Sequence, residues 1–139
     1  MAHDFLADSD FFIALYSLSD TNHTHALRIL SSLAELSSLQ LFTSVFVYSE
    51  TATILSQRVA QKTAHHFMED ITKQGVILMY PDEIILKTAQ DCFKKQRSKN
   101  VSFVDAINIT LMREYTFSGL LSFDQDYVKN GITLVSLKS

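Results

Sequence analysis

Residues 5–14 of the chain read FLADSDFFIA, and this stretch decides the fold. Its first three residues are apolar and form a short run that ends at an acidic residue, Asp8. The apolar residues that follow are typical of a brief helix, which Asp10 could cap and which would end near Tyr16. The stretch therefore predicts a buried strand, a carboxylate at its carboxyl end, and a helix that starts at once.

The same alternation continues along the chain. Short apolar runs predict further strands at residues 39–43, 76–80, 117–122 and 132–136. Segments with a period of 3.6 residues predict helices at 23–36, 44–58, 61–73, 82–98 and 102–114. Alternating strands and helices with few hairpin turns favour an α/β fold with a mainly parallel central sheet of about five strands, flanked by helices. Because such sheets bind ligands outside the carboxyl ends of their strands, a site is expected there.

Composition limits the functions that are open to the chain. Its 139 residues suit one domain, expected to span residues 1–139. Twelve basic against fifteen acidic residues give a net charge of −3, which excludes a generally basic nucleic-acid-binding protein and leaves only a local basic patch for such contacts. A single cysteine, Cys92, excludes a disulfide framework. No membrane-spanning run or signal peptide is recognisable, so we expect a cytoplasmic chain without membrane contact.

Two aspartates follow predicted strands. Asp8 comes directly after the first strand, and Asp124 stands just beyond the strand predicted at 117–122. Each could serve as a helix cap or turn residue, and that local explanation suffices for either residue alone.

A third carboxylate, Glu50, interrupts an apolar helix. Phe46 and Ile54 are four residues away and Val47 is three away, so Glu50 lies on or beside the apolar stripe. A buried unpaired carboxylate costs several kcal/mol or takes up a proton, and a metal ion or a basic partner would remove that cost. Alternatively, Glu50 lies at the edge of the stripe and reaches water. The spacing favours neither interpretation.

The fourth carboxylate, Asp105, has a clear local role. Ser102 and Asp105 match a capping box, with Ser102 as N-cap and Asp105 three residues later. Yet a helix that starts beside the carboxyl edge of the sheet could also aim a carboxylate at a metal ion. Together, carboxylates from separate segments without cysteine or clustered histidine ligands describe an oxygen site that suits Mg²⁺ or Mn²⁺, the ions of phosphoryl chemistry.

These residues resemble the motifs of PIN-domain nucleases. The similar segments occur in order along nearly the whole chain, at residues 5–14, 20–26, 42–50, 101–106, 121–127 and 132–135. The small single-domain format most resembles the VapC-type toxins of toxin–antitoxin pairs. The resemblance implies a metal-dependent endoribonuclease that leaves 5′-phosphate and 3′-hydroxyl ends, a homodimer, and a separate antitoxin that enters the active-site groove.

Carried over by position, the resemblance assigns the metal ligands and catalytic residues as Asp8, Glu50, Asp105 and Asp124. Asp10 is a departure, because the family more often has a small polar residue there. Asp126 is an extra carboxylate, so either it or Asp124 could face the metal; Asp124 is nearer the strand end. Ser102 could orient a carboxylate or hold a water, although capping is its simpler role.

A basic segment precedes the capping box. Four of the twelve basic residues fall within six positions, at Lys94, Lys95, Arg97 and Lys99. Lysines suit a helix C-terminus, which is the simpler role for the first two. Arg97 and Lys99 are the candidates for contact with RNA phosphates, because such contacts provide most sequence-independent affinity.

Two other functions fit part of the sequence. Asp8-Ser9-Asp10 after a strand also matches haloacid-dehalogenase-like phosphatases, with Asp8 as nucleophile. Phe12 departs from that pattern, the chain is short for that core, and Glu50 would have no role. A PIN-like interaction module without catalytic activity is the third possibility, distinguished by the absence of stabilisation by Mg²⁺ or Mn²⁺.

Overall fold

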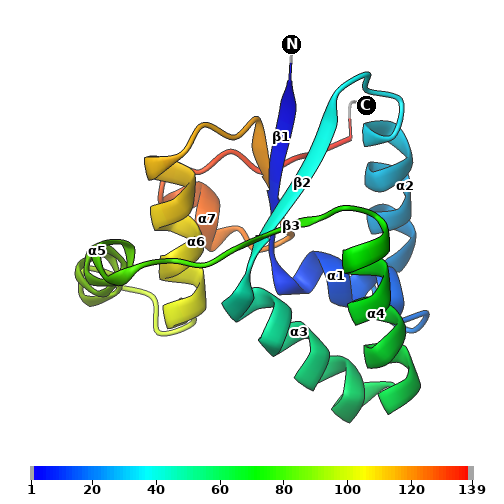
Figure 1. Ribbon diagram of the computed structural model, residues 1–139. Coiled ribbons are helices and arrows are strands. Elements are labelled where there is room, and N and C mark those ends of the chain that lie inside the picture. Colours follow the sequence, from blue (N-terminus) through cyan, green and yellow to red (C-terminus); the bar gives the residue numbers. More distant parts are fainter. Residues whose placement is uncertain (1, 138–139) are drawn as a thin grey trace.

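A computed structural model describes residues 2–137 of the protein (Figure 1). Its centre is a sheet of four parallel strands in the order β3-β2-β1-β4. The strands are β1 (His3–Ala7), β2 (Leu39–Ser44), β3 (Ile77–Met79) and β4 (Gly119–Leu121). The predicted α/β architecture with a parallel sheet is therefore confirmed.

Seven helices connect and follow the strands within residues 2–137. They are α1 (Ser9–Tyr16), α2 (His23–Leu33), α3 (Val45–Arg58), α4 (Gln61–Lys73), α5 (Glu83–Lys94), α6 (Phe103–Glu114) and α7 (Asp126–Lys129). Helices α1 to α4 lie on one side of the sheet and α5 to α7 on the other (Figure 1). No helix of the described chain combines the length and apolarity needed to cross a bilayer.

The central strand, β1, contributes side chains to both hydrophobic cores. Side chains alternate between the two faces of a strand, so Phe5 and Ala7 pack with α1 to α4, whereas Leu6 packs with α5, α6 and α7. Leu121 and Leu120 of β4 divide between the two cores in the same way. A strand buried on both faces reads as an unbroken apolar run, which is why residues 5–7 predict it so clearly.

The sheet has four strands rather than about five. The segment predicted as a last strand, 132–136, makes a single parallel bridge between Leu134 and Leu120. Two backbone hydrogen bonds hold it: Leu120 N donates to the Thr133 carbonyl oxygen, and Val135 N donates to that of Leu120, both over 2.9 Å. Beyond this bridge residues 132–136 form no ladder, so they are not a strand of the sheet.

Several helix ends differ from the predicted ones. Asp8 rather than Asp10 caps α1, because its side chain accepts from the Ser9 N–H. Helix α5 ends at Lys94 instead of residue 98. Just after its end, the side-chain amide of Gln96 donates to the Cys92 carbonyl oxygen (3.1 Å). The sequence does not predict helix α7, since a four-residue helix carries too little periodicity to recognise.

The strand order places a reversal point beside β1. The chain moves outward from β1 to β2 and β3, then returns to the other side of β1 as β4. In open α/β sheets, ligands bind at the carboxyl ends of strands where the order reverses. Asp8 follows β1 and Asp124 lies in the segment after β4, so both stand at this position.

Candidate active site

Asp8 is the most deeply buried carboxylate of the reversal point. Its side chain caps α1, and the residue is only 4% exposed. Oδ1 accepts hydrogen bonds from the Ser9 backbone N–H (2.7 Å) and from Asn108 Nδ2 (3.0 Å). Oδ2 accepts from the Tyr127 hydroxyl (2.6 Å). The position of Asp8 is therefore fixed by three elements: α1, α6 and α7.

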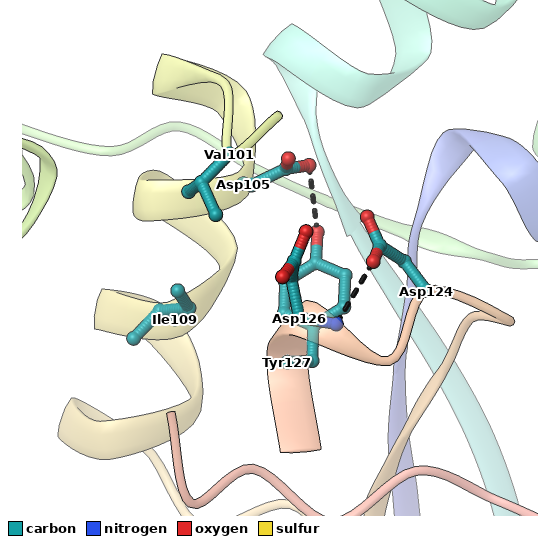
Figure 2. A pocket seen from close by; sticks show the side chains of 6 residues that line it. All are labelled: Val101, Asp105, Ile109, Asp124, Asp126 and Tyr127. Carbon is teal, nitrogen blue, oxygen red and sulfur yellow. Dashed lines mark hydrogen bonds between the residues drawn. The ribbon is translucent and has the colours of Figure 1, made fainter. Parts of the chain in front are cut away.

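Asp105 uses its two carboxylate oxygens for different purposes. The capping box is present as predicted: Ser102 N donates to Asp105 Oδ2 (2.9 Å) and Asp105 N donates to Ser102 Oγ (3.1 Å). The other oxygen, Oδ1, lies 3.0 Å from the Tyr127 hydroxyl (Figure 2). Capping α6 and facing the site are thus compatible roles for one side chain.

The Tyr127 hydroxyl joins Asp8 and Asp105. It accepts from Asn108 Nδ2 (3.0 Å), and it lies within hydrogen-bond distance of both carboxylates. A phenol has one proton to donate. The shorter of its two carboxylate contacts is the one to Asp8 Oδ2. The hydroxyl therefore has two carboxylate acceptors within reach and one proton to share between them.

The pKa values of Asp8 and Asp10 reflect this crowding. Burial, followed by the charges of Asp10 and Asp105, raises the pKa of Asp8 to about 8, although hydrogen bonds from Tyr127 and Ser9 act in the opposite direction. Burial raises the pKa of Asp10 to about 6. Burial also raises the pKa of the Tyr127 hydroxyl, so it stays protonated. A cation would favour the ionised form of each carboxyl group.

Asp10 holds the loop that carries Asp124. Its Oδ2 accepts from Ser122 Oγ (2.9 Å) and from the Phe123 backbone N–H (2.8 Å). Its Oδ1 is buried and finds no hydrogen-bond partner among the described residues. The charge of Asp124 contributes to the raised pKa of Asp10, so these two carboxylates are neighbours. Asp10 thus positions this loop through Oδ2, while its Oδ1 makes no hydrogen bond within the described residues.

Asp124 and Asp126 stand at the mouth of the site. Together with Asp105 they line a small hollow around Tyr127 (Figure 2). Asp124 Oδ1 accepts from the Asp126 backbone N–H (2.9 Å), which shapes the turn into α7. Asp126 Oδ1 lies 3.6 Å from Lys129 Nζ. Both carboxylates thus stand beside the hollow, and the choice of Asp124 as the one directed to a metal stays a prediction.

Glu50 lies in the second turn of α3, a helix that starts at the carboxyl end of β2. The buried residues of α3 are Val47, Thr51 and Leu55, and Glu50 is half-buried beside them. The sequence allows Glu50 either on the apolar stripe of the helix or at its edge, and the structure has it at the edge. Within residues 2–137, no side-chain hydrogen bond or ion pair ties Glu50 to the residues around Asp8, so its role stays a prediction.

The donor set suits a hard divalent cation. All candidate ligands are carboxylate oxygens, and the buried Oδ1 of Asp10 lacks a partner within the described chain. Over residues 2–137, no three Asp, Glu, His or Cys side chains are already grouped as a complete metal cage. Mg²⁺ commonly uses one or two carboxylates, retained waters and substrate phosphates rather than such a cage. Asp8 and Asp105 fit that requirement.

The predicted RNA-contact residues lie in the connection between α5 and α6. Both Arg97 and Lys99 are exposed there, shortly before the capping box of Ser102. Arg97 lines a cavity that adjoins the acidic hollow, whereas Lys99 does not. The two residues are thus near the site in the chain, but only Arg97 faces a concave surface beside it.

Two residues of the site, Asn108 and Tyr127, are not predicted from the sequence. Both are buried, and both bind Asp8. A usable signal existed for Asn108, because it lies in a run of six buried helical residues, Ala106–Leu111, where an amide needs partners. Tyr127 lies in a short helix, where the local sequence pattern does not indicate that its hydroxyl binds Asp8.

Loss of the Tyr127 hydroxyl should destabilise the metal-free protein. Tyr127→Phe removes the donor to Asp8 Oδ2 and the acceptor of Asn108 Nδ2, both buried, so we expect a loss of about 2 kcal/mol in the free energy of unfolding. Urea denaturation in EDTA measures it. Tyr16→Phe is the matched control, since its half-buried hydroxyl donates to Asp70 (2.6 Å), and it should cost about 1 kcal/mol or less. Equal losses would contradict the role given to Tyr127.

Comparison with known proteins identifies the family. The sequence profile of the PIN domain family matches residues 5–132. The fold is similar to the crystal structure of Mycobacterium tuberculosis VapC20, a toxin that cleaves the sarcin–ricin loop, with a TM-score of 0.85 and 23% identity, covering 96% of this chain and 99% of that one. It is also similar to FitAcB from Neisseria gonorrhoeae, with a TM-score of 0.63 and 13% identity, covering 94% and 95% of the two chains.

A search of curated proteins gave no significant match. The profile match nevertheless spans nearly the whole described chain, and it includes Asp8, Glu50, Asp105 and Asp124. With the parallel sheet and the carboxylates at its reversal point, it assigns the fold without relying on the low-identity structures. The chain belongs to the PIN domain family.

Proposed function

We propose that this protein is an endoribonuclease that depends on Mg²⁺ or Mn²⁺ and acts as the toxin of a VapBC-like toxin–antitoxin pair. PIN domains are generally nucleases. The observation that supports an intact site here is the approach of Asp8 and Asp105 to one hydroxyl, at 2.6 Å and 3.0 Å, although they come from distant parts of the chain. Charges brought together in this way require a counter-ion when both are ionised.

The proposed ligands are Asp8, Asp105 and Asp124. The chemistry that Mg²⁺ or Mn²⁺ supplies when bound is Lewis acidity toward phosphate oxygens and toward an attacking water. Asn108 and Tyr127 hold Asp8 in place through their hydrogen bonds. These contacts fix the carboxylate orientation before substrate binds, which lowers the reorganisation needed during reaction.

Glu50 is the proposed fourth acidic residue. Helix α3 starts where β2 ends, and β2 is the neighbour of β1. This position supports the proposal that Glu50 faces the site from the side opposite β4. Asp124 approaches from the β4 side. We assign Glu50 either to the metal or to the orientation of the attacking water, as the family resemblance implies.

The toxin assignment rests on the family and on the fold shared with VapC20. An antitoxin would be a separate chain, and we propose that it enters the groove at the carboxyl ends of the strands. A homodimer through α3 and α4, residues 44–73, is also part of the proposal. Phe46, Val59 and Met68 of this region are exposed apolar residues, at 37%, 44% and 38%. The proposal places the protein in the cytoplasm with its RNA substrate.

The test is cleavage of a panel of structured RNAs. We expect endonucleolytic products with 5′-phosphate ends in Mg²⁺ or Mn²⁺, and none in EDTA, with activity restored by excess divalent ion. End-labelled RNA and mapping of product termini provide the measurement. No cleavage of any RNA in either metal would contradict the proposal. A phospho-enzyme formed from a small phosphate ester would instead favour the phosphatase chemistry of Asp8.

A further inference from the structure

A second cavity, of about 410 Å³, adjoins the acidic hollow. Val101 and Asp126 line both, so the two openings are continuous along one surface. The cavity is lined by the end of α5, the connection from α5 to α6, the last turn of α6, and α7. Its volume is in the range of sites that hold small ligands, which run from about 300 to 1,000 Å³.

The charge of this cavity is opposite to that of the acidic hollow. Its four cationic lining residues come from three segments of the chain: Lys95, Arg97, Arg113 and Lys129. Asp126 is its only carboxylate among the described residues. The whole chain has a net charge of −3, so four cations against one carboxylate is a local concentration of positive charge. Such a surface attracts phosphates.

Hydrogen bonds hold the cavity walls together. Gln96 and Asn130 exchange two side-chain hydrogen bonds, each 3.0 Å long, which tie the end of α5 to the end of α7. Arg113 Nη2 donates to the Asn130 carbonyl oxygen (3.0 Å), which ties α6 to the same point. A guanidinium has five N–H donors, so Arg113 keeps others for a ligand.

Lys129 is also available to a ligand. Its ammonium group lies 3.6 Å from Asp126 Oδ1, but its side chain is 76% exposed. Exposed ion pairs contribute little, about 0 to 1 kcal/mol, so a phosphate can compete for this lysine.

We propose that this cavity binds the phosphate backbone of the RNA substrate on one side of the cleaved bond. This inference rests on the proposed function. No aromatic side chain is among the described residues that line the cavity, so it offers no surface on which bases stack. Its cations contact phosphates, which carry no sequence information. Sequence selection therefore falls to other surfaces, and this cavity supplies affinity and strand direction.

The test compares two lysines in matched environments. Lys129 pairs with Asp126 at 3.6 Å and is 76% exposed; Lys73 pairs with Glu69 at 3.9 Å and is 72% exposed. Lys73 ends α4, which packs in the core on the other side of the sheet from α5 to α7, and it does not line the cavity. Lys129→Gln and Lys73→Gln therefore remove equivalent charges, one inside the cavity and one outside it.

Binding is measured by fluorescence anisotropy with a single-stranded oligoribonucleotide, on an Asp8→Asn background in EDTA, where no cleavage is expected. The logarithm of the binding constant falls linearly with the logarithm of the salt concentration, and each neutralised phosphate of a single strand contributes about 0.7 to that slope. Removing one such cation therefore lowers the affinity about fivefold at 0.1 M salt. We expect this weakening for Lys129→Gln and for Arg113→Gln, and less than twofold for Lys73→Gln. Urea denaturation confirms that each variant is folded.

A cleavage assay with the native Asp8 separates this inference from the proposed function. For Lys129→Gln we expect KM to rise about fivefold, because one phosphate is no longer neutralised, with kcat changed less than twofold. Metal-dependent cleavage with identical KM values for Lys129→Gln and Lys73→Gln would overturn the cavity assignment and leave the nuclease intact. Absence of all RNA cleavage would overturn the proposed function, while the anisotropy series would still decide whether the cavity holds RNA.

Discussion

Replacing Asp8 by Asn should lower the rate of RNA cleavage by at least about 10²- to 10³-fold. Lewis-acid stabilisation is worth several kcal/mol of the barrier, and each 1.36 kcal/mol corresponds to a factor of ten. The Asn side chain keeps the shape of Asp8 and retains an oxygen for the Ser9 N–H, so the fold should persist. What it removes is the negative charge that holds a divalent ion.

RNA binding should survive the same substitution. Removing a buried carboxylate reduces the repulsion of phosphates, so affinity for RNA in EDTA should be unchanged or higher. Asp91→Asn is the control, because Asp91 is an exposed residue of α5, and its rate should stay within twofold of wild type. An Asp8→Asn protein that cleaves RNA at the wild-type rate would refute the assignment of the site.

The second large effect is a loss of stability with rising pH in the metal-free protein. The folded-state pKa values of Asp8 and Asp10 are raised to about 8 and about 6, from 3.8. Between pH 4 and pH 8 the native state therefore holds more protons than the unfolded chain, and stability falls as pH rises. Asp105 and Tyr127 face Asp8, while Ser122 and Asp124 lie beside Asp10.

The expected size is a few kcal/mol, because one pKa unit corresponds to about 1.4 kcal/mol for each group. In EDTA, the Tm should therefore fall on the order of 10 °C between pH 5 and pH 8. Calorimetry or thermal denaturation followed by circular dichroism measures it. Asp8→Asn should flatten the profile, and Mg²⁺ should stabilise the wild type more at pH 8 than at pH 5. A Tm that rises over this interval would contradict the burial of ionisable carboxyl groups at the site.

The parts of the site that the sequence predicts are those with local signals. The apolar run before Asp8 identifies β1 because the strand is buried on both faces, and Ser102 with Asp105 identifies the start of α6 because a capping box is a contact within four residues. Both signals place a carboxylate at a defined end of an element. The parallel sheet then brings those ends together, which is a property of topology rather than of spacing.

What the sequence does not predict depends on contacts between distant residues. Tyr127 and Asn108 meet Asp8 across 119 and 100 residues of chain. The apolar neighbours of Asn108 indicate that its amide needs a partner, but nothing near either residue indicates that the partner is Asp8. The prediction of a fifth strand is wrong for a related reason, since residues 132–136 make only the bridge between Leu134 and Leu120, and pairing along a segment depends on its tertiary placement. Asp10 resembles a helix cap in sequence, yet its oxygen binds the loop at Ser122 and Phe123.

The central claim is that Asp8 and Asp105 bind a divalent cation together, and titration with Mn²⁺ tests it most directly. Electron paramagnetic resonance of free Mn²⁺ reports binding without need of an RNA substrate. The affinity for Mn²⁺ should be at least about tenfold lower than that of the wild type in Asp8→Asn and in Asp105→Asn, because each substitution removes a charged ligand. It should be unchanged in Asp91→Asn. Equal Mn²⁺ affinity in all four proteins would contradict the account.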